Sequence, residues 1–555
     1  MSRESFVSPA SQNQTDVFAV HGADPEVLAY AMAKYSRSAL SMRESLAEIG
    51  AQRAEQFLNT FYFQYGHRSI ADLAHIAFAV ERLSLLAAIL LVDEQRWDGQ
   101  ERSTRYQNFL KSGWYLPDFG TDAASRDLYT ATIDSLFTTY QQTTASVLEV
   151  LRQRIPCPAT QDEAAWLRTL RARAFDVARY LLPLATNTSL GQIVSARTLE
   201  TQVSRLLTSP LAEVRELGLK LREAATGPAW NVQSNAAHAL VEKIAQAEQK
   251  GVLKGHDFSR TIEDSQKDGA SAPEGSLAAE AAALLNREVR TAPTLVKYAA
   301  ANLYQQQTHA ELTAAATELL AGLPIAAAPV VDLVERTESL EVELAATLIY
   351  SASHHPYRQI RDLVAALPEA RVTEIIELGL RNRSRHDEAL RAFHAGAALR
   401  FDILMDIGGF RDMHRHRRCT QIIQGFTTQH GYETPTNCDL PPDVDLLAEA
   451  GALEGFQAAL DQAHAASRTI AASQAPEAQA SALYLLPLAT RIRSLFKMDF
   501  AEAQYITELR SGPAGHFSYR RVAWEMFLAL KKQHPSLAKH IRVTDFTQPI
   551  DLLQR

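Results

Sequence analysis

The chain has 555 residues, of which 46% are hydrophobic and 22% are charged, and its net charge at pH 7 is −8. A single hydrophobic core stops growing at roughly 250–300 residues, so this length predicts two or more domains. The acidic balance argues against a dedicated nucleic-acid-binding protein, although a local basic pocket is compatible with it.

Neither the cysteines nor the apolar segments indicate an extracellular or membrane protein. The three cysteines have no paired spacing, which argues against a disulfide framework or a cysteine-based zinc site. The N-terminal segment MSRESFVSPASQNQ lacks the apolar core of a secretion signal. The most apolar run, Leu83–Val92, is too short to span a bilayer. We therefore expect a soluble, cytoplasmic protein without a membrane partner.

The first half of the chain predicts helices around one strand. Apolar residues alternate at Ile76, Phe78 and Val80, which is the period of a strand with one buried face. An apolar helix is expected directly afterwards, at 84–92. Other segments have helical spacing of Ala and Leu, namely 25–65, 123–151, 163–181 and 196–225. Residues 256–277 are rich in Gly, Ser, Asp and Lys, as is typical of a linker.

The second half contains a strand followed by a basic cluster. Apolar side chains fall on every second residue from Leu399 to Ile407, and Gly408-Gly409 is expected to end this strand. The following stretch, Arg411–Gln421, reads RDMHRHRRCTQ and is predicted to begin a helix. Guanidinium and imidazole donors at this density suit a pyrophosphate, because Arg meets phosphate with a two-pronged donor pair. The alternative is a solvated basic helix face.

The two halves of the chain are related. ARYLLPLAT at Ala178–Thr186 is matched by ALYLLPLAT at Ala482–Thr490, a shift of 304 residues with eight of nine positions identical. The strand followed by a polar segment also recurs, at 76–95 and 399–418. We interpret this pattern as a duplication, with domains at 1–255 and 278–555 joined by the linker. Two copies in one chain can pack as a pseudo-dimer through a self-complementary surface.

The motifs of both halves together resemble the flavin-dependent thymidylate synthases (ThyX), whose signature is RHRxxSxNExSxRY. The first half has GHxS at 66–69 and keeps ExSxRY at 101–106, but Asp93-Glu94-Gln95 stands in place of RHR. The second half keeps Arg415-His416-Arg417, but has Gly425, Thr427 and Thr428 in place of Ser, Arg and Tyr. Later motif positions divide in the same way: Arg179 against Leu483, Arg510 against Leu206, and Arg197 against Ala501.

This sorted loss implies one composite pocket in each chain. In the family, each site is built where the subunits of a homotetramer meet, so a duplicated chain can keep one intact pocket while motifs drift elsewhere. The resemblance therefore implies an α+β, helix-rich fold with two ThyX-like domains in tandem. Two such chains reproduce the family's tetramer, so a homodimer is expected.

The resemblance also implies the chemistry. A ThyX enzyme methylates C5 of dUMP, with methylenetetrahydrofolate as the carbon donor and with FAD, reduced by NADPH, as the source of reducing equivalents. Arg510 and Ser103 are the implied catalytic residues, Arg510 as a cation near the uracil carbonyl and N3. The implied nucleotide-binding residues are Glu101, Ser103, Arg105, Tyr106, Arg179 and Arg510. The implied FAD-binding residues are Arg415, His416, Arg417, Arg197 and His67.

The individual residues have simpler alternatives. Arg105-Tyr106 fits an exposed turn, Arg179 a salt-bridge or capping partner, and Arg510 a residue that neutralises a helix C-terminus. His67, Asp72 and His75 are poorly spaced for a metal site, and none is expected. Neither GxGxxG nor GxxxxGK[ST] occurs, so any NADPH docks transiently at the flavin.

One departure from the family bears on the substrate. Asp412 stands three residues before RHR, where the family has a glutamine of the nucleotide pocket. An acid there either presents a different hydrogen-bond pattern to a base or pairs with Arg411. Two other functions therefore stay open: a diverged flavoprotein that acts on another nucleotide, and a non-catalytic ThyX-like binding protein.

Overall fold

The computed structural model has two compact units, each made of three segments of the chain. One unit lies within residues 1–76, 195–200 and 220–299, and the other lies within residues 77–194, 201–219 and 300–555. The expected linker at 256–277 lies outside the described residues. The residues that the structure describes are 24–34, 68–110, 112–230, 243–244, 246, 289–302, 329–333, 339–351, 357–381, 393, 399–435 and 445–553.

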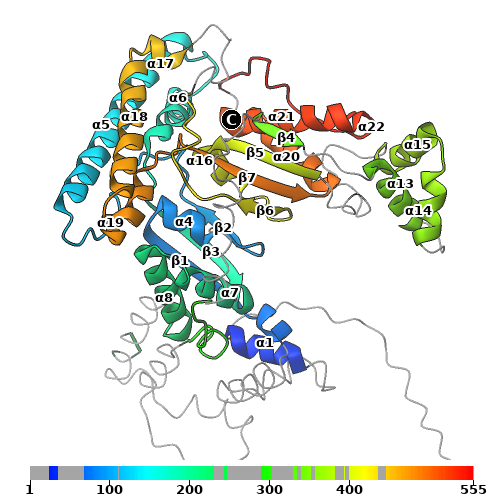
Figure 1. Ribbon diagram of the computed structural model, residues 1–555, viewed down its shortest axis with the longest axis horizontal. Helices are drawn as coiled ribbons and strands as arrows, with labels where there is room; N and C mark the ends of the chain where they lie inside the picture. Colours follow the sequence, from blue (N-terminus) through cyan, green and yellow to red (C-terminus); the bar gives the residue numbers. More distant parts are fainter. Residues whose placement is uncertain are drawn as a thin grey trace, which may run out of the picture. The chain divides into compact units, whose positions relative to one another are not determined.

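The described part is helix-rich with two small sheets, as expected for an α+β fold (Figure 1). The predicted helices at 123–151 and 163–181 are confirmed, whereas 196–225 forms two helices that are separated at Ser209-Pro210. The helices are α1 (Pro25–Lys34), η2 (Arg68–Asp72), α4 (Leu85–Leu91), α5 (Ala123–Arg154), α6 (Glu163–Ala178), η3 (Arg179–Leu181), α7 (Ala196–Leu207), α8 (Ala212–Thr226), α13 (Leu340–Ser351), α14 (Tyr357–Ala365), α15 (Glu369–Leu380), α16 (Ile407–Met413), α17 (Leu446–Glu449), α18 (Leu453–Ala471), α19 (Pro476–Ser481), η5 (Ala482–Leu485), α20 (Phe500–Ser511), α21 (Phe517–Gln533) and α22 (Pro535–Ala538).

The first sheet has the strand order β1-β3-β2, with strands β1 (His75–Ser84), β2 (Asp98–Glu101) and β3 (Asn187–Ser195). The alternating run from Ile76 is confirmed as β1. Ser84 has extended backbone and caps the following helix, because its hydroxyl accepts a hydrogen bond from the Ala87 amide. Helix α4 therefore begins at Leu85, where the sequence predicted an apolar helix.

The second sheet has the order β4-β5-β7-β6, and each neighbouring pair is antiparallel. Its strands are β4 (Val331–Leu333), β5 (Leu399–Asp406), β6 (Thr420–Ile423) and β7 (Arg491–Met498). Helix α21 packs against β4 and β5, and α5 lies beside α18 within the same unit (Figure 1). The alternating apolar residues of β5 are buried, as the sequence predicted.

The helix after β5 differs from the prediction. Asp406 caps α16 by accepting a hydrogen bond from the Gly409 amide at 2.7 Å, so the helix begins at Ile407 and Gly408-Gly409 lies in its first turn. The helix ends at Met413, and Arg415–Arg418 therefore lies in turns rather than on a helix face. Both the predicted basic helix and its solvated-face alternative are wrong for these four residues.

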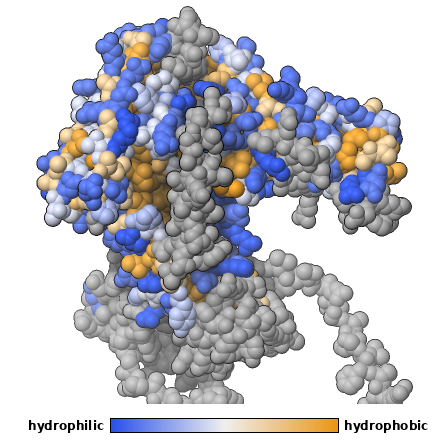
Figure 2. Space-filling view, viewed as in Figure 1, coloured by the Kyte–Doolittle hydropathy of each residue, from blue (hydrophilic) through white to orange (hydrophobic). Residues whose placement is uncertain are grey.

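The surface in view mixes hydrophilic and hydrophobic residues, and a hydrophobic patch covers part of the α13–α15 helices (Figure 2). Two leucines of these helices are exposed, Leu363 and Leu378. Across the part of the chain that the structure describes, no helix has the length and apolar character needed to cross a membrane.

The predicted duplication is visible in the order of the elements. A strand, a helix and a strand are followed by further helices, a 3₁₀ turn, a strand and a helix, first from β1 to α7 and again from β5 to α20. The last helices, α7 and α20, begin at Ala196 and Phe500, which repeats the shift of 304 residues. The sheet orders β1-β3-β2 and β5-β7-β6 are also the same. We call these two sets of elements, each together with the helix that follows it (α8 or α21), the first and the second repeat.

The two LLPLAT segments pair with each other, one from each repeat. Pro183 and Pro487 form an antiparallel bridge at the centre of this contact. The amides on either side donate reciprocally, so that a bond from one repeat has its counterpart from the other, as in a self-complementary interface. The four bonds are Leu184 N to Leu486 O (2.9 Å), Leu488 N to Leu182 O (2.9 Å), Ala185 N to Tyr484 O (2.8 Å) and Ala489 N to Tyr180 O (3.1 Å).

The close packing at Gly409 gives a test of this fold. A Cβ atom at Gly409 would lie 2.4 Å from Ser518 Oγ and 2.8 Å from Met405 Cε, so we expect Gly409→Ala to destabilise the protein by about 1–3 kcal/mol through overpacking. Gly455 in α18 is the matched control, because a Cβ there meets no atom within 4 Å. Gly455→Ala should be neutral or stabilising by up to ~1 kcal/mol. Thermal unfolding of both variants measures this, and equal melting temperatures would contradict the packing.

Candidate functional site

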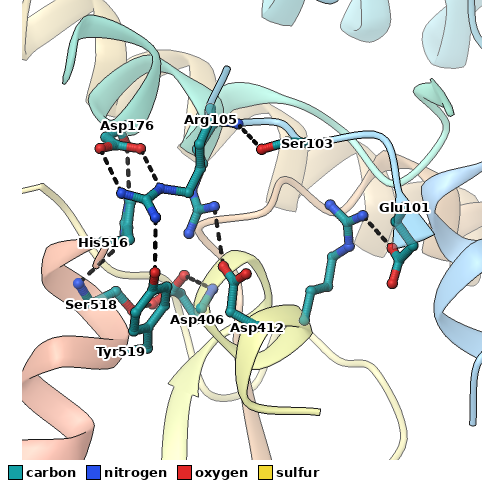
Figure 3. A network of polar contacts seen from close by, with 12 residues as sticks. Glu101, Ser103, Arg105, Asp176, Asp406, Asp412, His516, Ser518 and Tyr519 are labelled. Carbon is teal, nitrogen blue, oxygen red and sulfur yellow. Dashed lines mark hydrogen bonds and ion pairs between the residues drawn. The ribbon is translucent and has the colours of Figure 1, made fainter. Parts of the chain in front are cut away.

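Arg105 of the first repeat is buried and bonded to residues of both repeats. Its Nε and Nη2 atoms donate to the two carboxylate oxygens of Asp176, at 2.8 and 3.2 Å (Figure 3). Its Nη1 atom donates to the Tyr519 hydroxyl at 2.8 Å, and Nη2 also donates to the Ala514 carbonyl at 3.1 Å. Burial alone lowers the pKa of Arg105, but the Asp176 carboxylate more than offsets this and raises it. The exposed-turn alternative therefore fits only its neighbour Tyr106, which is 57% exposed.

Tyr519, on α21, is the residue where two of the expected arginines meet. The Arg105 guanidinium carbon lies 5.7 Å from the centre of its ring, and the Arg510 guanidinium carbon lies 5.4 Å from it. These distances allow cation–π attraction from both arginines. Burial, followed by the negative charge of Asp412, raises the pKa of Tyr519, which keeps the phenol protonated. One cation from each repeat thus contacts a single aromatic ring.

Arg179, at the start of η3, is buried but only partly paired. Its Nη1 atom lies 3.6 Å from Asp412 Oδ2, while Nε and Nη2 are buried without a hydrogen-bond partner among the described residues. Gly408 is the neighbour of these nitrogens, since a Cβ atom there would lie in ordinary van der Waals contact with both, at 3.5 Å. A buried donor without a partner is costly and needs an explanation. The salt-bridge alternative accounts for only one of its three nitrogens, which makes Arg179 a candidate anion-binding residue.

An ion pair between Arg411 of the second repeat and Glu101 of the first also joins the two repeats. Arg411 Nη2 donates to Glu101 Oε2 at 2.6 Å, and both side chains are less than 10% exposed. Arg411 is therefore engaged by an acid of the first repeat, whereas Asp412 faces Arg179. The alternative that Asp412 pairs with Arg411 is therefore wrong, because the ion-pair partner of Asp412 is Arg179.

His416 is placed to orient Arg510. Its Nε2 atom accepts a hydrogen bond from Arg510 Nε at 2.7 Å, and its Nδ1 atom lies 3.6 Å from Glu502 Oε1. Burial, assisted by the charge of Arg510, lowers the pKa of His416, so the ring is neutral and can accept this bond. The proton then resides on Nδ1, facing the carboxylate. Arg510 lies in the last turn of α20, but its side chain does more than neutralise the helix end.

Arg417 stacks on an aromatic ring that the sequence reasoning missed. Its guanidinium carbon lies 4.5 Å from the centre of a Trp97 ring, and the indole Nε1 atom is fixed by a 2.7 Å hydrogen bond to Gln192 Oε1. Both terminal nitrogens of Arg417 are buried without a hydrogen-bond partner among the described residues. Burial, together with the charge of exposed Arg415, lowers the pKa of Arg417. In the sequence, Trp97 lies two residues after the Asp93–Gln95 segment that replaces RHR, and this position alone could have marked it as a residue of the site.

The remaining expected residues are not brought into these contacts. Ser103 Oγ accepts a hydrogen bond from the Arg105 amide at 3.2 Å, which is a local turn interaction. Arg197 belongs to the other compact unit, where its Nη1 atom donates to Asp72 Oδ2 at 2.9 Å. His67 lies outside the described residues. In the portion described, no group of three or more His, Cys, Asp or Glu side chains could hold a metal ion.

A buried histidine supports Asp176 from the other side. His516 is fully buried, and its Nδ1 atom accepts from the Ser518 amide at 3.2 Å as the N-cap of α21. Its Nε2 atom therefore carries the proton and donates to the Asp176 carbonyl at 2.9 Å. Burial first, and the charge of Arg179 second, hold the pKa of His516 well below its ordinary value.

Equivalent positions in the two repeats share a helix-capping pair. In the second repeat, Ser518 Oγ donates to Asp406 Oδ2. In the first repeat, Ser84 Oγ donates to Glu213 Oε2 at 2.7 Å and the Ser84 amide donates to Oε1 at 2.8 Å. Serine and acid have exchanged places between the repeats, so the structural pair persists.

The charged residues of the site are not repeated in this way. By the register of the duplication, the equivalents of Asp412, Arg510 and Arg179 are Leu90, Leu206 and Leu483. Leucine side chains cannot bind an anion. Among the described residues, the duplication therefore gives two equivalent sites, and only one of them has the aspartate and the two arginines.

The chain belongs to the thymidylate synthase complementing protein family, whose sequence profile matches residues 19–227 and 332–536. The two matched segments contain the two repeats, and the resemblance drawn from the motifs is confirmed. The chain is 27% identical over 552 residues to a UPF0159 protein of Chlamydia muridarum (strain MoPn / Nigg), a match that covers 94% of this chain and 91% of the relative. A UPF0159 protein of Chlamydia pneumoniae is 26% identical, with 97% and 93% covered. A third, from Thermoplasma acidophilum, is 23% identical, with 93% and 94% covered. The relatives thus share the long form of the chain.

The depressed pKa of His516 predicts how stability depends on pH. In the unfolded chain this ring takes up a proton near pH 6.5, while the folded protein resists protonation. The unfolded state then binds more protons, so stability falls as the pH drops below about 6.5. His516→Asn keeps an N-cap acceptor but cannot titrate. Between pH 7.5 and 5.5 the melting temperature of the variant should therefore fall less than that of the wild type, and parallel profiles would contradict this account.

Proposed function

We propose that the chain is a flavin-dependent thymidylate synthase-like enzyme, which converts dUMP to dTMP with methylenetetrahydrofolate, FAD and NADPH. The observation that carries this proposal is the meeting of Arg105 and Arg510, one from each repeat, on the ring of Tyr519. Membership in the thymidylate synthase complementing protein family gives the reaction class. The site lies within one chain and takes residues from both repeats.

The nucleotide is held by the first repeat and activated by the second. Arg179 has two buried nitrogens available for a phosphate, and Arg105 fixes the wall beside it. Ser103, Glu101 and Tyr106 complete this side as a hydroxyl, an acceptor and an aromatic ring. Arg510, oriented by His416, places a positive charge where the uracil carbonyl and N3 become negative as C5 turns nucleophilic. Preorganised charge of this kind stabilises a transition state by about 3–4 kcal/mol for each donor.

The residues around Arg417 fit a flavin nucleotide. Its two unpartnered nitrogens suit a diphosphate, and exposed Arg415 adds a second cation beside it. His416 links this side to Arg510. FAD, when bound, supplies the hydride chemistry, with NADPH as its reductant. The protein contributes placement and charge.

The reciprocal bonds around Pro183 and Pro487 support a pseudo-dimer of two ThyX-like domains, 1–255 and 278–555, with 256–277 as the linker. We propose that two chains associate as a homodimer that resembles the family's tetramer. We also propose a cytoplasmic location, where dUMP is made and consumed, and no nucleic-acid or membrane partner.

A second candidate function follows from the acids of the site. Asp176 already satisfies Arg105 on two nitrogens, and Asp412 stands where the family has a glutamine. These carboxylates favour a diverged flavoprotein that acts on another nucleotide, or a ThyX-like binding protein without catalysis. Flavin content and dTMP formation separate the three possibilities.

The test is the absorption spectrum of the purified protein, followed by tritium release from dUMP tritiated at C5, with methylenetetrahydrofolate and NADPH. We expect bound flavin and release of tritium. Arg179→Ala should weaken dUMP binding by about 2–5 kcal/mol, roughly 30-fold or more, because it removes a buried charged donor. Arg126→Ala is the control, since Arg126 is 55% exposed and pairs with an exposed aspartate.

The contrary results are distinct. A yellow protein that binds a nucleotide but releases no tritium selects the diverged flavoprotein. A colourless protein that is insensitive to Arg105→Ala and Arg417→Ala selects the non-catalytic binding protein.

A further inference from the structure

Asp412 is the more exposed partner of the ion pair with Arg179. Its Oδ2 atom is 3.6 Å from Arg179 Nη1, and its side chain is 21% exposed while that of Arg179 is only 2% exposed. Figure 3 shows Asp412 on α16, with its carboxylate directed towards the side chains around Arg105.

The charge of Asp412 acts on both repeats. Its negative charge acts to raise the pKa of Arg105, of Tyr519 and of His416. Two neighbouring cations already have carboxylate partners of their own, Arg105 with Asp176 and Arg411 with Glu101. Asp412 is thus the acid paired with Arg179, two nitrogens of which lack a hydrogen-bond partner among the described residues.

We propose that Asp412 is a built-in counter-anion, which competes with the phosphate of a bound nucleotide for Arg179 and so sets the affinity of the site for phosphate monoesters. This inference rests on the proposed function, in which Arg179 holds the phosphate. A dianionic phosphate brings two negative charges to a place that already holds one, and like charges at this range repel. The phosphate displaces Asp412 from Arg179, and the exposed carboxylate turns towards water.

This role differs from recognition of the base by Asp412. A carboxylate that accepts hydrogen bonds from a base contributes to binding, so its removal weakens every ligand that carries the base. A counter-anion opposes only the charged ligand, so its removal strengthens the nucleotide and leaves the nucleoside unchanged. The sign of the effect therefore distinguishes the two roles.

The experiment compares dUMP with deoxyuridine, which lacks the phosphate, by calorimetric titration of the full-length protein. Asp412→Asn and Asp412→Gln should each bind dUMP about tenfold more tightly, which corresponds to ~1.4 kcal/mol of binding free energy. Neither should change the affinity for deoxyuridine. Two variants guard against misfolding of one, and their melting temperatures are checked against the wild type.

Asp402→Asn is the matched control. It makes the same change in net charge on the same repeat, but Asp402 pairs with Arg493, at 2.7 Å, and not with Arg179. The control should bind dUMP as the wild type does. An equal gain in the control would overturn the inference, because the effect would then be one of net charge.

Other outcomes overturn the inference separately from the proposed function. If the wild type binds dUMP through Arg179, but the Asp412 variants bind it equally or more weakly, the counter-anion role is wrong and the proposed function stands. An equal gain for dUMP and deoxyuridine has the same meaning. If neither the wild type nor any Asp412 variant binds dUMP, both the inference and the proposed function are wrong.

Discussion

The pairing of the two LLPLAT segments is the constraint on which the site depends. Hydrogen bonds run reciprocally across the bridge between Pro183 and Pro487, so each repeat is held by the backbone of the other. Each segment also leads directly from a 3₁₀ turn into a strand, η3 into β3 and η5 into β7. Because Arg179 begins η3, the contact that joins the repeats also positions a cation of the site. Backbone bonds of this kind do not depend on side chains, which allows the two copies to diverge around them.

Burial then decides what each arginine can do. Arg105 is satisfied by a carboxylate, a phenol and a carbonyl, so it gives a rigid wall. Arg179 and Arg417 are buried with nitrogens that lack hydrogen-bond partners, and a guanidinium in this state has a strong affinity for an anion. Paired and unpaired cations thus have different roles, the first structural and the second suited to ligands. The same logic makes Asp412 important, since it is the acid that pairs with the incompletely paired Arg179.

Much of the fold follows from local sequence patterns. The strand at Ile76 and the apolar helix after it have clear periodicity, and the repeat at Ala178 and Ala482 is nearly identical. The basic helix was mispredicted because Asp406 caps the helix earlier, so that only seven residues are helical. Charge content alone gave no information about that cap. A helix boundary set by one side-chain oxygen is difficult to place from periodicity.

The partners within the site could not be predicted, because they are distant in sequence. Arg105 and Tyr519 are 414 positions apart, and Arg411 and Glu101 are 310 apart. The arginines could be found from the sequence, because they stand at positions of the family's motifs. The sequence reasoning missed Asp176, Trp97 and Tyr519, because an acid or an aromatic residue on a helix or in a loop is common and carries no signal until the fold brings it to a cation.

The central claim is that a chain with two repeats has a single site made from both. The most direct test is the stoichiometry of dUMP binding, measured by calorimetric titration with the wild type and with Arg179→Ala and Arg510→Ala. The account predicts one nucleotide per chain, with binding lost when the arginine of either repeat is removed. Two nucleotides per chain, or binding that depends on the arginine of only one repeat, would contradict it.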